Sequence, residues 1–397
     1  MIIFPLILFW VLSSLVVYTY VIYPILLFVL NKLVRNDLPH LAADDFPFLY
    51  VVFSAFNEEK VIEEKLNSIF STSYPLDRIR IYVGSDCSTD DTNRLIADFA
   101  GKYSQLIFFP FTHRQGKSGV INSLMQEVRH HAQQYNHQDA VVILTDANVM
   151  FTADLFYTLT RLFRDTRVGL VAAKILNRGV GEGISVQENL YIRLENYIKF
   201  FEGRVFGAMQ GAFGACYAIR VNLIPEIPPR YLMEDFYISM YVLRRGFRSV
   251  ASLQAICYED LPGDMEEEYK RKRRISAGNW QNLAVYWPLL FRPGVVSFCF
   301  WSHKVIRWIT PFFLLLLFPL LSALAWHSTF YSLLLLLYLL FTFSPLIHRF
   351  LLSKGMDIRW IRYPAYFVMM QLALVEGFRW YVSGISGGGW TPTARKR

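Results

Sequence analysis

The chain has 397 residues, a formal net charge of +8, 54% hydrophobic side chains and 18% charged side chains. This composition excludes disorder as the main state, because the chain carries more apolar surface than water would tolerate. It is also too apolar for an ordinary soluble enzyme and too charged for an all-membrane transporter. The apolar excess is local: residues 1–31 contain no charged side chain, and residues 308–347 contain none apart from His327. The composition is therefore an average over two environments.

The positive net charge raises the question of a nucleic-acid partner. Basic residues gather beside the apolar stretches, for example Lys32, Arg35 and Arg395–Arg397. The bias of lysine and arginine towards the cytosolic side of membranes explains this placement, so we predict no nucleic-acid partner. The four cysteines show no CxxC spacing, which argues against a zinc site or a disulfide framework and fits a reducing cytosolic setting.

The first apolar stretch, Met1–Leu30, is long enough to cross a bilayer. The alternative is a signal peptide, which normally has a basic start, a shorter apolar stretch and small residues at the cleavage site. These features are missing, so we predict a retained transmembrane helix over 1–31. Lys32 and Arg35 follow this helix and place the next domain in the cytosol, which predicts a multi-pass protein of the inner cell membrane.

The C-terminal part predicts further membrane segments. Residues 294–308 mix apolar and basic side chains, which is typical of an interfacial helix. The region 309–385 then holds two clear spans, 309–326 and 330–347, and a last apolar stretch at 363–375. The loop 348–362 and the tail 386–397 are both basic and favour the cytosol, so one full crossing between them cannot satisfy both. A re-entrant or interfacial segment and a loop that breaks the charge rule are the alternatives.

Residues 36–292 read as a cytosolic α/β domain. Short apolar runs predict strands at Phe48–Phe53, Ile79–Val83, Leu106–Phe109, Val141–Thr145 and Val168–Ala173. Helical patterns separate them; in Glu58–Phe70 the apolar positions form one stripe, and Asn57 is a candidate N-cap. Strands that alternate with helices predict a doubly wound, mostly parallel sheet.

Polar and acidic residues follow four of the predicted strands. They lie in Ser54–Glu59, Gly84–Thr92, His113–Gly119 and Asp146–Asn148. Each group alone has a structural explanation as a cap or a turn. Ligands in doubly wound sheets bind at the carboxyl ends of strands, so four such groups at one edge predict a binding site there.

These motifs, together with Met233-Glu234-Asp235 further along, resemble the family 2 glycosyltransferases of the membrane-embedded synthase type, which includes cellulose, hyaluronan and poly-N-acetylglucosamine synthases. The resemblance implies a GT-A type sheet over 36–292, flanked by transmembrane helices. It implies transfer of a sugar from a UDP-sugar donor to a glycan or lipid acceptor, with inversion at the anomeric carbon. It also allows for a small membrane partner subunit beside the lipid bilayer.

The resemblance assigns donor binding to Ala55, Asn57, Glu58, Asp86, Lys117, Asp146 and Arg274. It implies that Asp86 accepts a hydrogen bond from the uracil ring, while the cations lie near the diphosphate. The family's Asp-x-Asp motif is Asp146-Ala147-Asn148 here, so Asp146 and Asn148 are the expected ligands of Mg²⁺ or Mn²⁺. Arg271–Arg274 has an alternative role as a polybasic patch on anionic lipid.

The resemblance makes Asp235 the general base and gives Glu234 an orienting role, so both are expected in catalysis. It assigns acceptor binding to Gly211, Phe213, Gly214 and Trp280. For the glycine segment, close backbone packing is the alternative. The family's acceptor-stacking tryptophan is replaced by Ile275, which predicts short products or single additions unless Trp280 or the membrane spans hold the chain.

The sequence leaves two functions of another class open, a membrane transporter and a catalytically inactive membrane scaffold. A transporter would carry ionisable residues inside the membrane, and Glu376 and Arg379 near the last apolar segment are the candidates. The small number of spans and the large soluble domain argue against a transporter, and the acidic residues Asp86, Asp146 and Asp235 argue against an inactive scaffold. The sugar, the linkage and the acceptor do not follow from the sequence.

Overall fold

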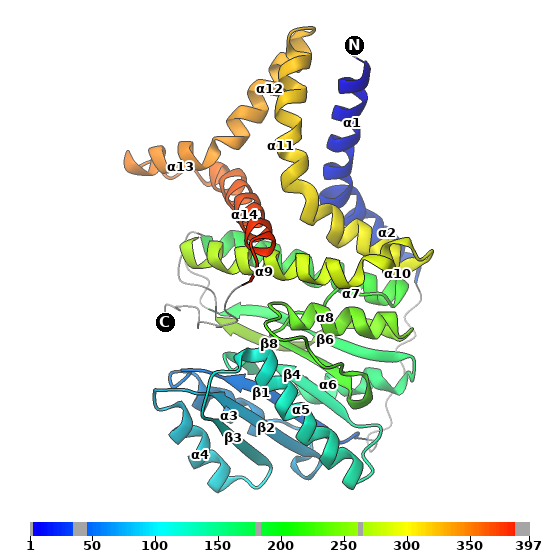
Figure 1. Ribbon diagram of the computed structural model, residues 1–397, viewed down its shortest axis with the longest axis vertical. Coiled ribbons are helices and arrows are strands. Elements are labelled where there is room, and N and C mark those ends of the chain that lie inside the picture. The colour runs from blue at the N-terminus through cyan, green and yellow to red at the C-terminus, as the bar shows by residue number, and fades with distance from the viewer. Residues whose placement is uncertain (1–2, 35–45, 179–183, 261–264, 386–397) are drawn as a thin grey trace. The chain divides into compact units, whose positions relative to one another are not determined.

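The computed structural model describes residues 3–34, 46–178, 184–260 and 265–385, which form two compact units. We call them the sheet unit, within 30–180 and 189–262, and the helical unit, within 1–29, 181–188 and 263–384. The predicted basic tail, 386–397, lies outside the described residues. Figure 1 gives the element labels used below.

The sheet unit is built on one mixed sheet in the order β3-β2-β1-β4-β7-β6-β8-β5. The strands are β1 Leu49–Ala55, β2 Ile79–Asp86, β3 Leu106–Phe111, β4 Val141–Thr145, β5 Val149–Phe151, β6 Val168–Arg178, β7 Cys216–Arg220 and β8 Arg248–Asp260. Pairings among β1, β2, β3 and β4 are parallel, as is β6 with β8, whereas β7 is antiparallel to β4 and β6, and β5 is antiparallel to β8. The predicted strands are confirmed.

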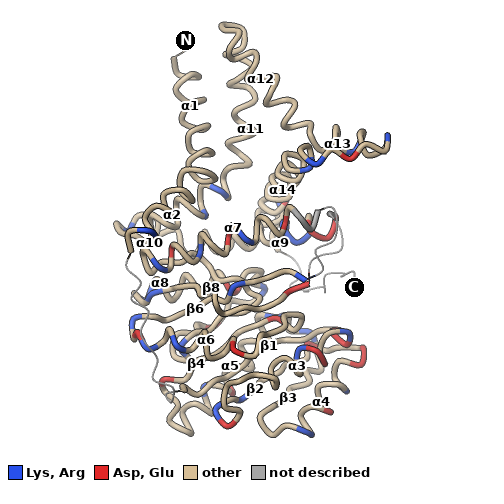
Figure 2. Tube along the Cα trace, turned by 180° about the vertical axis from the view of Figure 1, so that it is seen from behind, with Lys and Arg blue, Asp and Glu red and all other residues tan. Residues whose placement is uncertain are grey.

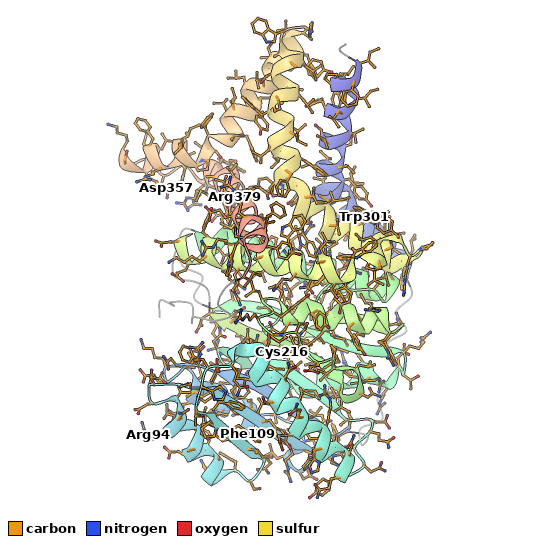
Figure 3. The ribbon with its side chains drawn as sticks, viewed as in Figure 1. Arg94, Phe109, Cys216, Trp301, Asp357 and Arg379 are labelled. Atoms are coloured by element: carbon orange, nitrogen blue, oxygen red, sulfur yellow. The ribbon has the colours of Figure 1, made fainter. Side chains whose placement is uncertain are left out.

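Helices cover both faces of the sheet, as its apolar strands require. On one face, Leu49, Val51 and Phe53 of β1 belong to a core with α3 Ile62–Phe70, α4 Thr92–Lys102 and α6 Leu155–Thr160. On the other, Tyr50 and Val52 pack in a core with α5 Gly116–Gln134 and α8 Glu234–Arg244. Cys216 of β7 lies inside this unit, and Arg94 points outwards from α4 (Figure 3). Short 3-10 turns occupy Leu76–Arg78, Arg161–Arg164 and Val221–Leu223.

The described residues contain two segments long and apolar enough to cross a membrane, Ile3–Leu33 and Val295–Ala325. The first joins α1 Ile3–Val17 and α2 Tyr23–Leu33 through a π-helical turn, and the second joins α10 Val295–Cys299 and α11 Ile306–Ala325 in the same way. The residues predicted as a separate interfacial helix, 294–308, therefore form the start of a continuous helix. Figure 2 shows that α1 carries no charged residue.

The span predicted at 330–347 is broken in two. Helix α12, Thr329–Thr342, and helix α13, Ser344–Ser353, meet at an angle of 55°, so this pair is a third candidate span among the described residues if it is counted as one. Pro345 in the first turn of α13 accounts for the break, because proline lacks a backbone N–H and clashes with the preceding turn. The last predicted segment lies in α14, Arg359–Val382, which is not among these candidates.

Helix α9, Met265–Tyr286, packs closely against α14 within the helical unit, and a 3-10 turn at Trp287–Phe291 follows it. A Cβ added at Gly377 of α14 would lie 2.4 Å from the Arg273 carbonyl oxygen, so glycine permits this approach. Ser276 Oγ donates to the Leu374 carbonyl at 2.7 Å. Glu188, in the first turns of α7 Ile184–Phe206, accepts from Lys272 Nζ at 3.3 Å.

Candidate active site

The loops after β1 and β2 hold each other through hydrogen bonds. The Asn57 N–H donates to Ser88 Oγ at 3.1 Å, and Asn57 Oδ1 accepts from the Thr89 N–H at 2.9 Å. The Glu58 N–H donates to Thr92 Oγ1 at 2.8 Å. Asn57 has a φ of 51°, in the left-handed region that asparagine tolerates, and α3 begins five residues later at Ile62. The prediction of Asn57 as an N-cap is therefore wrong, because its side chain accepts a hydrogen bond from the loop after β2 instead.

Asp86 organises the loop between β3 and α5. Its Oδ1 accepts from the Gln115 N–H at 2.7 Å, and its Oδ2 accepts from the Gly116 N–H at 3.1 Å and from Arg114 Nε at 3.0 Å. The Arg114 guanidinium lies 3.4 Å from the centroid of the Phe56 ring, a cation–π contact. An ionised carboxylate offers about four acceptor positions, so Asp86 retains capacity for one more donor.

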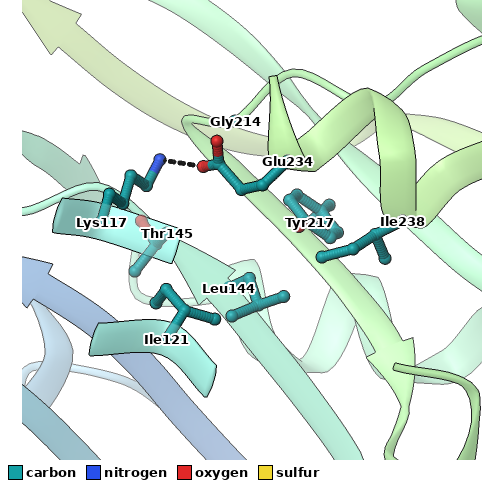
Figure 4. A pocket seen from close by; sticks show the side chains of 8 residues that line it. All are labelled: Lys117, Ile121, Leu144, Thr145, Gly214, Tyr217, Glu234 and Ile238. Atoms are coloured by element: carbon teal, nitrogen blue, oxygen red, sulfur yellow. Dashed lines mark ion pairs between the residues drawn. The ribbon is translucent and has the colours of Figure 1, made fainter. Parts of the chain in front are cut away.

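Lys117 joins the ends of three elements by ion pairs. It lies in the first turn of α5, and its Nζ is 2.5 Å from Oδ1 of Asp146, which follows β4. It also pairs with Oε1 of Glu234 in the first turn of α8 (Figure 4). Burial lowers the pKa of Lys117, but the two carboxylates raise it by more, so its pKa lies above the ordinary value. Lys117 is therefore a permanent cation between two carboxylates.

A pocket opens beside this ion-pair cluster (Figure 4). The residues that line it are Lys117, Ile121, Leu144, Thr145, Gly214, Tyr217, Glu234 and Ile238. Burial, followed by the charges of Glu234 and Asp235, raises the pKa of Tyr217 well above its usual value, so its phenol stays neutral. The pocket thus combines apolar walls with a few charged groups.

Asp235 lies next to Glu234 and is 7% exposed. Its Oδ1 accepts from the Phe236 N–H at 2.7 Å, and a Cβ added at Gly214 would come within 3.0 Å of its Oδ2. Burial, reinforced by the negative charge of Glu234, raises the pKa of Asp235 to about 6, while Lys117 and Lys199 act in the opposite direction. A carboxyl with this pKa can take up and release a proton near neutral pH.

The segment 211–214 is fixed to α8 beside Asp235. The Ala212 N–H donates to Ser239 Oγ of α8 at 2.8 Å. Gly211 has a φ of 75°, and a Cβ there would lie 2.4 Å from the Phe236 ring, so the position requires glycine. Close packing, the alternative explanation of the glycine segment, is therefore present, and the role of this segment in acceptor binding stays a prediction.

Asp146 and Asn148, the residues predicted to hold a divalent cation, lie in one turn between β4 and β5. Asp146 keeps 30% of its side chain exposed and uses one oxygen on Lys117, while Asn148 is buried nearby in the same turn. Hard cations bind one or two carboxylate or amide oxygens and take phosphate oxygens and water for the rest. The described residues contain no cluster of three or more histidine, cysteine or acidic side chains that could hold a metal ion. A cation at Asp146 would therefore depend on oxygens from the nucleotide.

Two predicted site residues, Arg274 and Trp280, belong to α9 in the helical unit rather than to the sheet unit. The Trp280 ring packs 4.7 Å from Phe378 and 6.1 Å from Phe312, measured between ring centroids. Their roles in donor and acceptor binding stay predictions. The other predicted site residues all lie in the sheet unit, and Ala55 ends β1 beside the interlocked loops.

Sequence reasoning missed two buried lysines near the site. Lys65 Nζ donates to Thr145 Oγ1 at 3.0 Å and to the Val149 carbonyl at 2.5 Å, on either side of the Asp146 turn. Burial lowers the pKa of Lys65 to about 7. The available signal was its position on the apolar stripe of α3. Lys199 of α7 donates to the Gly211 carbonyl and lies 3.9 Å from the centroid of the Phe213 ring.

A solved structure shares this fold. The mannosyltransferase PcManGT from Pyrobaculum calidifontis, in complex with GDP-Man and Mn²⁺, superimposes with a TM-score of 0.70 at 18% identity over 94% of this chain and 99% of that chain. The expected GT-A type sheet is therefore confirmed.

The family follows from two profiles. Residues 50–227 match the profile described as Glycosyl transferase family 2, and residues 141–375 match Glycosyl transferase family group 2. The second match covers more than half of the chain, so the chain belongs to the family 2 glycosyltransferases.

Curated relatives are similar over part of their length. The probable glycosyltransferase YdaM of Bacillus subtilis is 25% identical over 59% of this chain and 56% of its own length. The poly-beta-1,6-N-acetyl-D-glucosamine synthase of Staphylococcus epidermidis is 21% identical over 66% of this chain and 60% of its own length. The beta-monoglucosyldiacylglycerol synthase of Nostoc sp. is 25% identical over 32% of this chain and 26% of its own length. The chain thus spans less than two thirds of the length of these relatives.

Proposed function

We propose that the chain is an inverting glycosyltransferase of the inner cell membrane, which moves a sugar from a UDP-sugar to a glycan or lipid acceptor. The observation that carries the proposal is the buried carboxyl of Asp235, with a pKa near 6, beside the Lys117 cluster. A base poised near the working pH, next to cations and carboxylates that suit a nucleotide diphosphate, matches the needs of sugar transfer.

In the proposed reaction, the acceptor hydroxyl oxygen attacks the anomeric carbon of the donor. The bond from that carbon to the diphosphate oxygen breaks, and UDP leaves with the bonding electron pair. Asp235 takes the hydroxyl proton as the new bond forms, so charge and atoms balance. Attack from the face opposite to the leaving group inverts the anomeric carbon. Glu234 keeps Lys117 in place beside the base.

The donor would lie across the ends of β1, β2 and β4. Asp86 would accept from the uracil N–H with its remaining acceptor position, and the loop containing Asn57 and Glu58 would hold the uridine. Lys117 can turn from Asp146 towards the diphosphate, because it is 23% exposed and its stem is flexible. Mg²⁺ or Mn²⁺ at Asp146 and Asn148 would neutralise charge on the leaving diphosphate.

The acceptor is a sugar chain or a lipid-linked group. The names of the relatives from Staphylococcus epidermidis and Nostoc sp. point to a polysaccharide and a glycolipid as the two product classes. Segment 211–214 would face the acceptor, because Gly214 adjoins the Asp235 carboxyl. With isoleucine at position 275, short products are the expectation.

A donor panel tests the proposal. The full-length protein, purified in detergent, is incubated with UDP-sugars and with GDP-mannose, and release of the nucleoside diphosphate and product length are measured. UDP release that depends on one UDP-sugar and an acceptor supports the proposal. Release of GDP from GDP-mannose, with no release of UDP from any UDP-sugar, would show that the donor is GDP-mannose. No release from any donor would favour the transporter or the inactive scaffold.

A further inference from the structure

Lys65 is a lysine that is completely buried inside the sheet unit. It belongs to α3, and its exposed fraction is 0%. Its Nζ donates to Thr145 Oγ1 at 3.0 Å and to the Val149 carbonyl at 2.5 Å. The same nitrogen lies 3.6 Å from the centroid of the Phe151 ring, a cation–π contact. Each of the three donor positions of the amine therefore has a partner.

The burial of this side chain has a cost that an apolar residue would avoid. A buried charge normally pairs with an opposite charge, but among the described residues no carboxylate forms an ion pair with Lys65. Burial lowers the pKa of Lys65 to about 7, and a neutral amine retains two N–H donors, which are enough for both hydrogen bonds. A methionine could fill the same space without the cost of a buried charge. What the lysine adds is therefore the two hydrogen bonds.

The turn between the two acceptors contains the predicted metal ligands. Asp146 and Asn148 lie between Thr145 and Val149 in the sequence. Within the turn, the Val149 N–H donates to the Asp146 carbonyl at 3.3 Å. The Lys65 amine thus ties the end of β4 to the start of β5 across this turn. Groups that hold metal ligands in position contribute to metal affinity without touching the metal.

A further hydrogen bond extends this tie to the segment beside the proposed base. Thr145 Oγ1, which accepts from Lys65, donates to the Ala215 carbonyl at 2.6 Å. Ala215 follows Gly214, where an added Cβ would lie 3.0 Å from Asp235 Oδ2. Lys65 and Thr145 therefore connect α3 with both the turn after β4 and the backbone next to Asp235.

We propose that Lys65 is a positioning residue, which fixes the turn of Asp146 and Asn148 so that these two side chains can hold a divalent cation on the donor diphosphate. The inference rests on the proposed function, because it requires a nucleotide and a metal at this turn. Lys65 acts through the turn, since its own side chain is fully buried. Without it, the Val149 carbonyl would lose a buried donor, and the turn would have to move to regain a partner.

Calorimetric titration with UDP tests the inference. The full-length protein in detergent is titrated once with Mn²⁺ and once with EDTA. The variants are Lys65→Met and the control Lys102→Met, which removes an exposed lysine at the end of α4. In Lys65→Met we expect the Kd for UDP with Mn²⁺ to rise by about 10- to 100-fold, the usual effect of losing a group that orients a metal ligand. The Kd in EDTA should stay native, because the loops after β1 and β2 are unchanged.

The comparison of the two titrations separates positioning from a purely structural role. A structural role would change the melting temperature but leave the effect of Mn²⁺ on the Kd at its native size, and this result would overturn the inference. Equal weakening with Mn²⁺ and with EDTA would also count against it, because the whole nucleotide site would then be lost. If Mn²⁺ had no effect on the native protein either, the metal site of the proposed function would fail together with the inference.

A second variant carries the test should Lys65→Met fail to fold. Thr145→Val keeps the shape of the side chain but removes the hydroxyl that links Lys65 to Ala215. We expect the same selective weakening with Mn²⁺. Hydrogen exchange reports on the turn directly, without metal or nucleotide. The amides of residues 146–149 should exchange faster in both variants than in the native protein, and native exchange rates there would refute the positioning role.

Discussion

Replacing Lys117 by methionine tests how the site controls its base. The change removes the charge shared by Asp146 and Glu234 and keeps an unbranched side chain of similar length. Opposite charges close to a carboxyl lower its pKa by about 1–3 units. Burial and Glu234 raise the pKa of Asp235 to about 6, and Lys117 is one of the groups that limit this rise. Its loss should therefore raise the pKa of Asp235 by about one unit or more.

The assay is the pH dependence of kcat/KM for the preferred donor. A base works in its deprotonated form, so kcat/KM of the native protein should rise with pH through a midpoint at about 6 and level off above it. In Lys117→Met the rise should move to higher pH, and in Lys117→Arg it should stay nearer the native position. Lys102→Met, which removes an exposed cation at the end of α4, is the control. An unchanged inflection in Lys117→Met would refute the coupling.

Three further changes probe the surroundings. Gly211→Ala should lower the free energy of unfolding by about 2–5 kcal/mol, because the backbone is left-handed there and the new Cβ clashes with Phe236. The control is Gly101→Ala, where a Cβ meets open space. Equal melting temperatures of the two variants would contradict this expectation. Burial lowers the pKa of Lys65 from 10.5 to about 7. Between these pH values the folded state binds fewer protons than the unfolded state, so the stability of the native protein rises with pH. The melting temperature of Lys65→Met should lack this rise. Asp146→Ala should abolish metal-dependent donor binding in a titration with and without EDTA, and activity that persists undiminished in EDTA would count against the metal site.

Apolar runs predicted the parallel strands well, because strands buried on both faces must be apolar throughout. Val141–Thr145 has the same bounds in the structure as in the prediction. Strand β8, Arg248–Asp260, was missed because its faces are unequally buried and its side chains are mixed. The start of α3 was misjudged because Glu58 and Glu59 suit a first turn, whereas in the structure both bond to the loop after β2.

Within the site, the positions of Asp86 and Asp146 just after predicted strands were enough to predict that their loops lie at one edge of the sheet, whereas the role of Asp235 was implied by the resemblance to the family. The ion pairs of Lys117 with two carboxylates were not predictable, because Glu234 lies far along the chain. Lys199 escaped notice for a different reason. A lysine is normally exposed, and burying one requires partners that appear once the tertiary fold is known.

The most direct measurement is a comparison of donor binding and turnover in Asp235→Asn. The variant keeps the shape of the side chain but cannot accept the acceptor proton. We expect UDP-sugar binding close to that of the native protein and a turnover lower by about 100-fold or more, the usual scale of base catalysis. Asp98→Asn, at a position of α4 whose side chain is 66% exposed, is the matched control and should behave as native. Near-native turnover in Asp235→Asn would contradict the account, because the base would then be another group.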